Sequence, residues 1–447
     1  MRLFAGFARA GVRYAVLRNH EQLPLCLDGR DLDLIVLPSD LRKAVDVVVR
    51  LAADFGLLFS NHYQDERMTQ IGLVCRRAGG LFDLKIDFFT SSQVFGIELL
   101  SASEMMRDLR WHNGLPVVSE VILLLDKFLF HLAVGKALHP KYDVLFAGIA
   151  RDHRPQLTKS LTPLLGEVAA RRCIEKIASG KGSRLAPMPR GRRLRMLLRM
   201  WSGRRAGGLS LMARFLLARL RQRLRPHGLL VSVSGPDGSG KTTVIDLVLA
   251  QLRQSAGADS VAYFHFRPKV LPRIAEIAKV TKAVSEVDTD YSRPHRASPS
   301  GWAGSLARLG YYGMDYVLGY AHVVRPALMD RKIVLFDRYF HDMICDPGRS
   351  RIGLRAWCLR TAGRLLPQPR FAFFIHVSPE VAHARKQELT REQIATLNLR
   401  YRDLVRRGWM IEISNMETAE QAAAAIVDCI FAHYDRRARR ALGMASR

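Results

Sequence analysis

The spacing of apolar residues in the first 180 positions switches between the two-residue period of a strand and the 3.6-residue period of a helix. Strands are predicted at 14–18, 31–36, 68–76 and 81–89, and helices at 39–55, 121–138 and 161–178. Ser39 is the predicted N-terminal cap of the first of these helices. This part of the chain is therefore predicted to be a mixed α/β domain.

The second half of the chain carries short, continuous apolar runs separated by helical spacing. Strands are predicted at 229–233, 261–266, 333–336, 371–377 and 410–414, with helices at 244–250, 270–284, 303–330 and 418–434 and a Pro-, Ser- and Arg-rich loop at 289–301. Continuous apolar runs are typical of strands buried on both faces. We therefore expect an α/β fold with a parallel sheet covered by helices on both faces and with ligands at the carboxyl ends of its strands.

A basic stretch without acidic residues separates the two patterns. Between Lys176 and Pro236 there are fifteen Lys or Arg and no Asp or Glu. Turn-forming residues at 189–193 and 202–208 are typical of chain breaks and indicate a boundary. We expect an N-terminal domain at 1–185, a basic linker at 186–227 and a C-terminal domain at 228–447.

The second half of this linker has the apolar spacing of an amphipathic helix. Its apolar positions are Leu209, Met212, Ala213, Leu216, Leu217, Leu220 and Leu224, with Arg214, Arg221 and Arg225 on another face. A helix of this kind beside an arginine-rich segment suits an anionic membrane surface, so 190–225 is a candidate membrane-binding segment. The alternatives are a linker helix that packs on one of the domains and a nucleic-acid contact, which no aromatic reading motif supports.

Composition limits the class of protein. A chain of 447 residues is too long for a single hydrophobic core, and 48% of its residues are hydrophobic. The net charge of +28 implies an anionic partner. Six cysteines without paired spacing fit a reduced, cytoplasmic protein, peripheral at the inner face of the membrane if the linker binds lipid. No signal peptide is recognisable, and the most apolar window, 121–134, is too short and too charged to span a bilayer. A homodimer is left open.

The segment Ser234–Thr243, SGPDGSGKTT, follows a predicted strand and leads into a predicted helix. This is the Walker A pattern, in which a glycine-rich loop turns backbone N–H groups toward phosphate oxygens. Lys241 would reach the β- and γ-phosphates, and the Thr242 hydroxyl would bind Mg²⁺. The candidate ATP-binding residues are Gly235, Asp237, Gly238, Ser239, Gly240, Lys241, Thr242 and Thr243. The alternative is a glycine-rich turn that merely joins a strand to a helix.

Further candidates follow the other predicted strands. Asp337 ends an apolar strand and would hold Mg²⁺, while Arg267, Arg338 and Tyr339 would bind the acceptor, with the two arginines pairing its phosphate. A buried structural ion pair of Asp337 with Arg338 is the alternative.

The loop between Pro236 and Ser239 carries no basic side chain, so charge on the transferred phosphoryl group must be neutralised from elsewhere. Arg385, Lys386 and Arg391 are placed for a closing lid, unless they are solvated charges on an exposed helix. The candidate catalytic residues are Lys241, Asp337, Arg338, Arg385 and Arg391.

Residues 228–440 resemble the thymidylate kinase family of P-loop nucleoside monophosphate kinases. The resemblance is carried by Gly235–Thr243, by the triplet Asp337-Arg338-Tyr339 and by the segment Phe373–Lys386. It implies the strand order 2-3-1-4-5 and an arginine-bearing lid after Arg385. Arg267-Pro268 stands where the family has Arg-Glu-Pro, and the glutamate is missing.

The first domain offers a second acidic pattern. Strand alternation places Asp31 and Asp33 on one face, and Asp87, or alternatively Asp83, could supply a third carboxylate from a neighbouring strand to bind Mg²⁺. The pattern resembles the minimal nucleotidyltransferase fold, and 17–24 resembles the opening of nucleotidyltransferase-like domains from bacterial surface-glycan gene clusters. The usual Gly-Ser pair is missing, which leaves open an active transferase, a degenerate binding or scaffolding domain, and a solvated acidic pair.

Together these features predict an ATP- and Mg²⁺-dependent phosphotransferase that phosphorylates dTMP or another nucleoside monophosphate. The alternatives are a kinase acting on a glycan or lipid-linked sugar precursor, and a non-catalytic ATP-binding scaffold.

Overall fold

The chain forms two compact units in a computed structural model that describes residues 1–27, 31–77, 80–203, 205–268, 270–271 and 301–444. Unit 1 comprises 1–221 together with 432–447, and unit 2 comprises 222–431. The C-terminal segment of the chain therefore belongs to the first unit. The helix predicted at 270–284 and the loop predicted at 289–301 fall almost entirely outside the described residues.

Unit 1 is built on a seven-stranded mixed sheet of order β3-β4-β5-β2-β1-β9-β8. These strands are β1 (Tyr14–Arg18), β2 (Leu32–Val36), β3 (Leu58–Gln64), β4 (Met68–Arg77), β5 (Gly80–Phe89), β8 (Arg110–His112) and β9 (Leu115–Val117), and a separate pair is β6 (Ser91–Val94) with β7 (Ile97–Ser101). The four strands predicted from apolar alternation are all present. The five that were not predicted are mostly short or polar.

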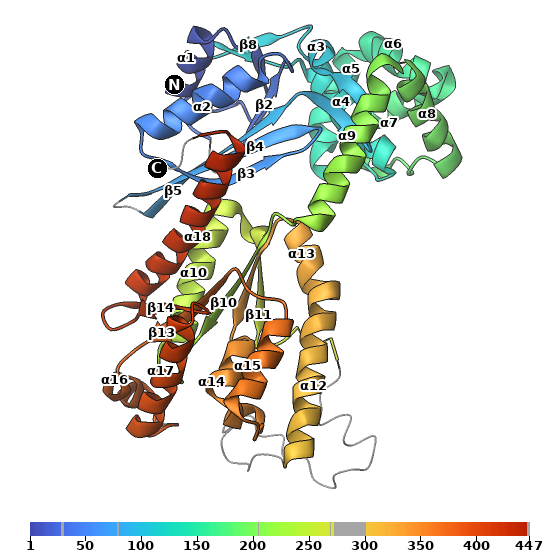
Figure 1. Cartoon of the computed structure of the whole chain (residues 1–447). Helices are drawn as coiled ribbons and strands as arrows, with labels where there is room; N and C mark the ends of the chain where they lie inside the picture. The colour runs from blue at the N-terminus through green and yellow to red at the C-terminus, as the bar shows by residue number, and fades with distance from the viewer. Residues whose placement is uncertain (28–30, 78–79, 204, 269, 272–300, 445–447) are drawn as a thin grey trace. The chain divides into compact units, whose positions relative to one another are not determined.

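Both faces of this sheet are covered (Figure 1). Val16 and Leu34 pack into one apolar cluster with α1 and α2, whereas their neighbours Ala15 and Ile35 pack into another with Met105 of α3. The helices are α1 (Arg2–Arg9), α2 (Leu41–Asp54), α3 (Ala102–Met105), α4 (Glu120–Val134), α5 (Asp143–Asp152), α6 (Arg154–Leu165), α7 (Glu167–Ala178), α8 (Arg190–Gly203) and α9 (Arg205–Leu224).

Two local predictions in unit 1 are wrong. Asp40, not Ser39, occupies the cap position of α2, and it makes no side-chain cap bond because its carboxylate pairs with Arg13 at 2.7 Å. The expected chain breaks at 189–193 and 202–208 lie within or beside α8 and α9. Glycine costs a helix only about 1 kcal/mol, and at Gly208 a Cβ would stand 2.9 Å from the Trp201 ring, so close packing favours glycine there.

Unit 2 contains a five-stranded, wholly parallel sheet of order β11-β12-β10-β13-β14. Its strands are β10 (Leu229–Ser234), β11 (Val261–His265), β12 (Ile333–Asp337), β13 (Phe371–His376) and β14 (Ile411–Ser414). In chain order this is the arrangement 2-3-1-4-5, so the predicted parallel α/β fold is confirmed.

Helices cover both faces of the unit 2 sheet (Figure 1). α10 packs on β10, β11 and β12, whereas α17 packs on β13 and β14 and contributes to the large cluster around Phe336 and Phe374. The helices are α10 (Lys241–Ala256), α12 (Trp302–Gly319), α13 (Arg325–Met329), α14 (Phe340–Cys345), α15 (Ala356–Leu365), α16 (Pro379–Arg385), α17 (Arg391–Arg406) and α18 (Ala419–Ala441). The residues of α18 from 432 onward belong to unit 1. A π turn at Tyr320–Val324 joins α12 to α13. Among the described helices, none combines the length and apolarity needed to cross a membrane.

Candidate functional site

The loop between β10 and α10 is held in a conformation that requires glycine. Gly238 and Gly240 have φ values of +83° and +81°, which L side chains rarely adopt. A Cβ at Gly238 would stand 2.3 Å from the carbonyl oxygen of Ala382, and one at Gly240 would stand 2.5 Å from Asn415 Nδ2. Asn415, which follows β14, donates to the carbonyl of Ser239 at 2.7 Å and fixes the loop from the other side. The loop therefore closes tightly over the start of α10.

Lys241 is the first residue of α10 and is only 7% exposed. Its Nζ donates to the carbonyl of Pro236 at 2.7 Å and lies 4.0 Å from Asp237 Oδ1. Burial, and then the nearby Arg338, lower the pKa of Lys241 to about 7. Thr242 and Thr243, also in the first turn of α10, are exposed. The amine thus lies under the loop, where an arriving phosphate would restore its charge.

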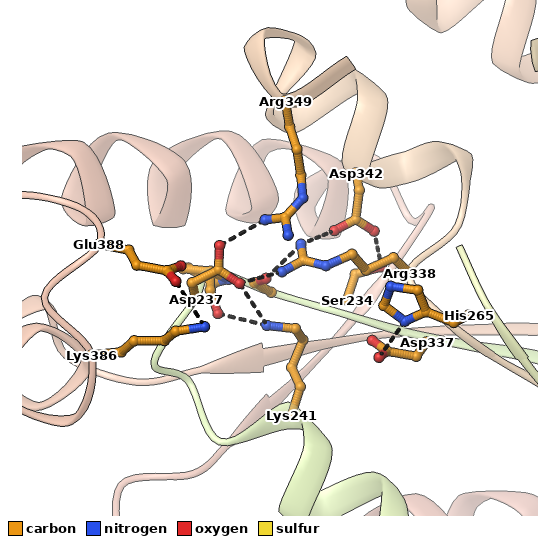
Figure 2. A network of polar contacts seen from close by, with 12 residues as sticks. Ser234, Asp237, Lys241, His265, Asp337, Arg338, Asp342, Arg349, Lys386 and Glu388 are labelled. Atoms are coloured by element: carbon orange, nitrogen blue, oxygen red, sulfur yellow. Dashed lines mark hydrogen bonds and ion pairs between the residues drawn. The ribbon is translucent and has the colours of Figure 1, made fainter. Parts of the chain in front are cut away.

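Asp237 is the centre of an ion-pair network on this loop (Figure 2). Arg338 Nη2 donates to its Oδ1 and Arg349 Nη1 donates to its Oδ2, each at 2.6 Å. Although burial opposes ionisation, Arg338, Lys241 and Arg349 hold the pKa of Asp237 well below its usual range. Two arginines and a lysine therefore converge on one carboxylate in the loop.

Arg338 is also held on its other side. Its Nη1 donates to Asp342 Oδ1 at 2.8 Å, and the same carboxyl group accepts from Ser234 Oγ at 2.5 Å and from Tyr401 OH at 2.8 Å. Arg338 is 4% exposed and lies between two carboxylates. Its ion pairs are thus with Asp237 and Asp342, whereas the alternative reading of the sequence paired it with Asp337.

Asp337 lies at the carboxyl end of β12, level with His265 of β11 and Val233 of β10. Its Oδ2 is 3.0 Å from His265 Nδ1, and Tyr263 donates to the same oxygen at 3.4 Å. Burial opposes ionisation, but His265 and Lys241 outweigh it and hold the pKa of Asp337 below its usual value. The other oxygen, Oδ1, is buried without a hydrogen-bond partner. An ionised carboxylate with one unpartnered oxygen fits a cation such as Mg²⁺.

No cluster of three or more His, Cys, Asp or Glu side chains within the described ranges could hold a metal ion. Mg²⁺ usually needs only one or two protein ligands, because substrate phosphates and water complete its shell. Asp337 and the Thr242 hydroxyl are the residues that would hold it at this edge.

The predicted lid residues lie after β13, around the junction of α16 and α17. Arg385 ends α16, and its Nη1 lies 3.3 Å from the position that a Cβ of Gly240 would take, so this guanidinium reaches the loop. Lys386 pairs with Glu388 at 3.1 Å, and Arg391 is exposed at the start of α17. Of the three, Arg385 is the one whose contact with the glycine-rich loop is shown.

Two predicted acceptor-binding residues are engaged within the protein. Arg267 donates to Asp315 Oδ2 at 3.0 Å, and its guanidinium lies over the rings of Tyr311 and Tyr312. Tyr339 is 3% exposed in the apolar core and donates its hydroxyl to the carbonyl of Pro367 at 2.8 Å.

In unit 1 the predicted carboxylates do not form a metal-binding cluster. Asp33 and Asp87 are register partners on adjacent strands, but Arg18 binds Asp33 through both Nε and Nη2, at 2.5 and 2.9 Å. Gln70 donates to Asp87 at 2.9 Å, and Asp31 pairs with Lys85 at 2.6 Å. Each carboxylate is therefore satisfied by a different side chain.

Four residues of the site were not predicted as functional, namely Arg349, Asp342, His265 and Asn415. His265 ends β11 and Asn415 directly follows β14, so the rule that ligands gather at the carboxyl ends of parallel strands could have indicated both. Asp342 lies in α14, four residues after Arg338. Arg349 lies in the short 3₁₀ turn Pro347–Ser350, which carries no sequence signal.

No protein-family model matches the chain. A thymidylate kinase from Ehrlichia chaffeensis is weakly similar in structure. It covers 46% of this chain and 99% of its own length, with 17% sequence identity and a TM-score of 0.32. A likeness at this level carries no conclusion about function.

Proposed function

We propose that unit 2 is an ATP- and Mg²⁺-dependent phosphotransferase of the thymidylate kinase type, which transfers the γ-phosphate of ATP to dTMP or another nucleoside monophosphate. The observation that supports this most directly is the juxtaposition of the glycine-dependent loop over Lys241 with the unpartnered Oδ1 of Asp337 at one edge of a parallel sheet. The loop offers donors for phosphate, and Asp337 offers an anionic oxygen for the metal.

The charges around this edge suit phosphoryl transfer. The reaction needs little covalent chemistry from the protein and depends on alignment and on positive charge near the transferred group. Lys241 and Arg349 converge on Asp237, and Arg385 approaches the same loop from α16. A bound Mg²⁺ would neutralise charge on the β- and γ-phosphates. Of these cations Lys241 is buried, so its charge acts on a bound phosphate with more effect than it would in water.

Asp237 has a specific part in this proposal. In the free protein its carboxylate holds Arg349 over the loop at 2.6 Å. The phosphate oxygens of a bound nucleotide would be a second anionic partner for the Arg349 guanidinium. Arg349 can therefore move from Asp237 to the nucleotide without losing a charged partner. Arg338 is more firmly held because Asp342 binds its other face. We therefore assign phosphate neutralisation to Lys241, Arg349 and Arg385, and positioning of Asp237 to Arg338.

The chemical identity of the acceptor is less constrained by the site than that of the donor. Arg267 and Tyr339 are already engaged, so binding a nucleoside monophosphate through them requires Arg267 to exchange Asp315 for the acceptor's phosphate. This observation keeps a glycan or lipid-linked sugar precursor as the second candidate acceptor.

For unit 1, the pairing of Asp33 with Arg18 favours a degenerate binding or scaffolding domain of the nucleotidyltransferase-like type over an active transferase. A guanidinium that neutralises the carboxylate removes the charge that a metal ion would otherwise balance.

The test is a transfer assay with γ-labelled ATP, Mg²⁺ and two panels of acceptors, nucleoside monophosphates and phosphorylated or lipid-linked sugars. Label transfer to a nucleoside monophosphate supports the proposal, and transfer to sugars alone supports the second candidate. ATP binding without transfer to any acceptor would indicate a non-catalytic scaffold and would refute both.

A further inference from the structure

Helix α9 exposes a row of leucines that the structure leaves uncovered. Leu209, Leu216, Leu217 and Leu220 have exposed fractions of 70%, 59%, 45% and 53%. At 3.6 residues per turn these four side chains fall within an arc of roughly 100°. Exposed leucines are common singly, but an aligned row on one helix marks an interaction surface.

The opposite side of the same helix is the side that packs. Leu211, Met212 and Phe215 are half-buried, and backbone or Cβ atoms of all three lie within 3.3 Å of the position that a Cβ of Gly96 would take. The helix is thus anchored to unit 1 by one face and presents the leucine row on another. Packing on a domain therefore describes the face that carries Leu211, Met212 and Phe215. It does not describe the leucine row, which is exposed.

Arginines border the leucine row on both sides. With the same helical period, Arg214 and Arg221 lie beyond one margin and Arg219 and Arg223 beyond the other. Helix α8 repeats the combination, with Leu194 and Leu198 exposed at 58% and 51% beside exposed arginines. The stretch from Lys176 to Pro236 contains no acidic residue. Any partner that covers the leucines therefore meets positive charge along both edges.

We propose that the exposed face of α9, with residues 209–221 as its centre, docks onto the surface of an anionic lipid bilayer. Leucines on the face would enter the boundary between headgroups and acyl chains, while the flanking arginines extend to lipid phosphates. A second copy of this chain fits less well, because a twofold contact through the leucine row would bring its arginine borders together. A nucleic acid would use the arginines but leave the leucines without a partner.

The experiment is co-sedimentation of the full-length protein with vesicles of phosphatidylcholine alone or with roughly one-third phosphatidylglycerol. We expect binding to the anionic vesicles at low salt, weakened as salt is raised. Arg214→Gln with Arg221→Gln should weaken partitioning roughly 25-fold, at about fivefold per arginine. The matched control, Arg50→Gln with Arg172→Gln, removes two exposed positive charges from α2 and α7 and should change binding much less.

A leucine variant separates insertion from simple charge attraction. Leu216→Ser with Leu220→Ser leaves the charge unchanged. It should weaken vesicle binding roughly tenfold or more, because each substitution removes a leucine side chain that would be buried in the bilayer. Both side chains are exposed, so the melting temperature should fall by no more than the small loss of helix propensity from Leu to Ser. The proposal is overturned if the wild type ignores anionic vesicles at low salt. It is equally overturned if the leucine variant binds as wild type does, or if it instead abolishes a dimer seen by light scattering.

Discussion

On the proposed function, the buried amine of Lys241 should make ATP binding depend on pH, and the size of the effect can be calculated. Burial lowers its pKa to about 7 in the free site, so above pH 7 the side chain is mostly neutral. A bound triphosphate favours the charged amine. Above pH 7 the neutral amine must therefore take up a proton from solution when ATP binds. Each pH unit above 7 adds about 1.4 kcal/mol to that cost, so the dissociation constant should rise roughly tenfold per unit up to the pKa of the bound state.

Two measurements check this linkage. Titration calorimetry of ATP with Mg²⁺ between pH 7 and 9 should show affinity falling by up to about a hundredfold. The apparent enthalpy should vary with the ionisation enthalpy of the buffer, because nearly one proton is taken up per ATP at pH 8 to 9. The phosphate groups contribute little to this proton uptake, because their second pKa is about 6 and they are already ionised above pH 7.

The control for this prediction is Lys241→Met, which keeps much of the side-chain volume. It should bind ATP weakly, and its residual affinity should be flat over the same pH range. Affinity that stays constant from pH 7 to 9 in the wild type, with no proton uptake, would refute the assignment of Lys241 as the buried phosphate ligand.

Further predictions concern the loop and the unit 1 carboxylates. Arg349→Gln should lower the rate of transfer by roughly 10- to 100-fold, whereas Arg355→Gln, which removes an exposed arginine nearby, should not. Gly238→Ala should abolish ATP binding detected by calorimetry, because its Cβ would collide with the carbonyl of Ala382. Burial raises the pKa of Asp87 to about 6, so its ionisation destabilises the fold once the pH exceeds the unfolded value near 4. Asp87→Asn should therefore gain up to about 3 kcal/mol relative to wild type between pH 4 and 7, measured by denaturant unfolding, and a constant difference would contradict the raised pKa.

The parallel sheet of unit 2 was predictable because burial on both faces leaves a continuous apolar run in each strand. Val231, Val334 and Phe373 are each fully buried, and each lies in such a run. Several strands of unit 1 escaped prediction for the opposite reason. β3, for example, contains Asn61 and His62 and has only one buried residue, Phe59. Its pairing with β4 depends on the backbone of its partner and not on its own apolar pattern.

The glycine-dependent loop before α10 was predictable because its residues are contiguous and its glycines are required by backbone geometry. The side chains that complete the site come from separate elements and meet only in the folded chain. Arg349 reaches Asp237 across 112 positions, and Asn415 reaches Ser239 across 176. In unit 1 strand alternation placed Asp31 and Asp33 on one face, but no local pattern could show that Arg18 of the neighbouring strand would neutralise Asp33.

The most direct test of the proposed chemistry compares transfer of γ-labelled phosphate by the wild type and by Lys241→Met, with the best acceptor from the screen. Lys43→Met, at an exposed lysine on α2, is the matched control. We expect Lys241→Met to lose at least about a hundredfold in rate, because the proposed transfer depends on the positive charge of this amine. The melting temperature should be equal or higher, because the change removes a buried charge whose Nζ contacts the loop and not the apolar core. Transfer by Lys241→Met at the wild-type rate would show that this loop is not the catalytic centre.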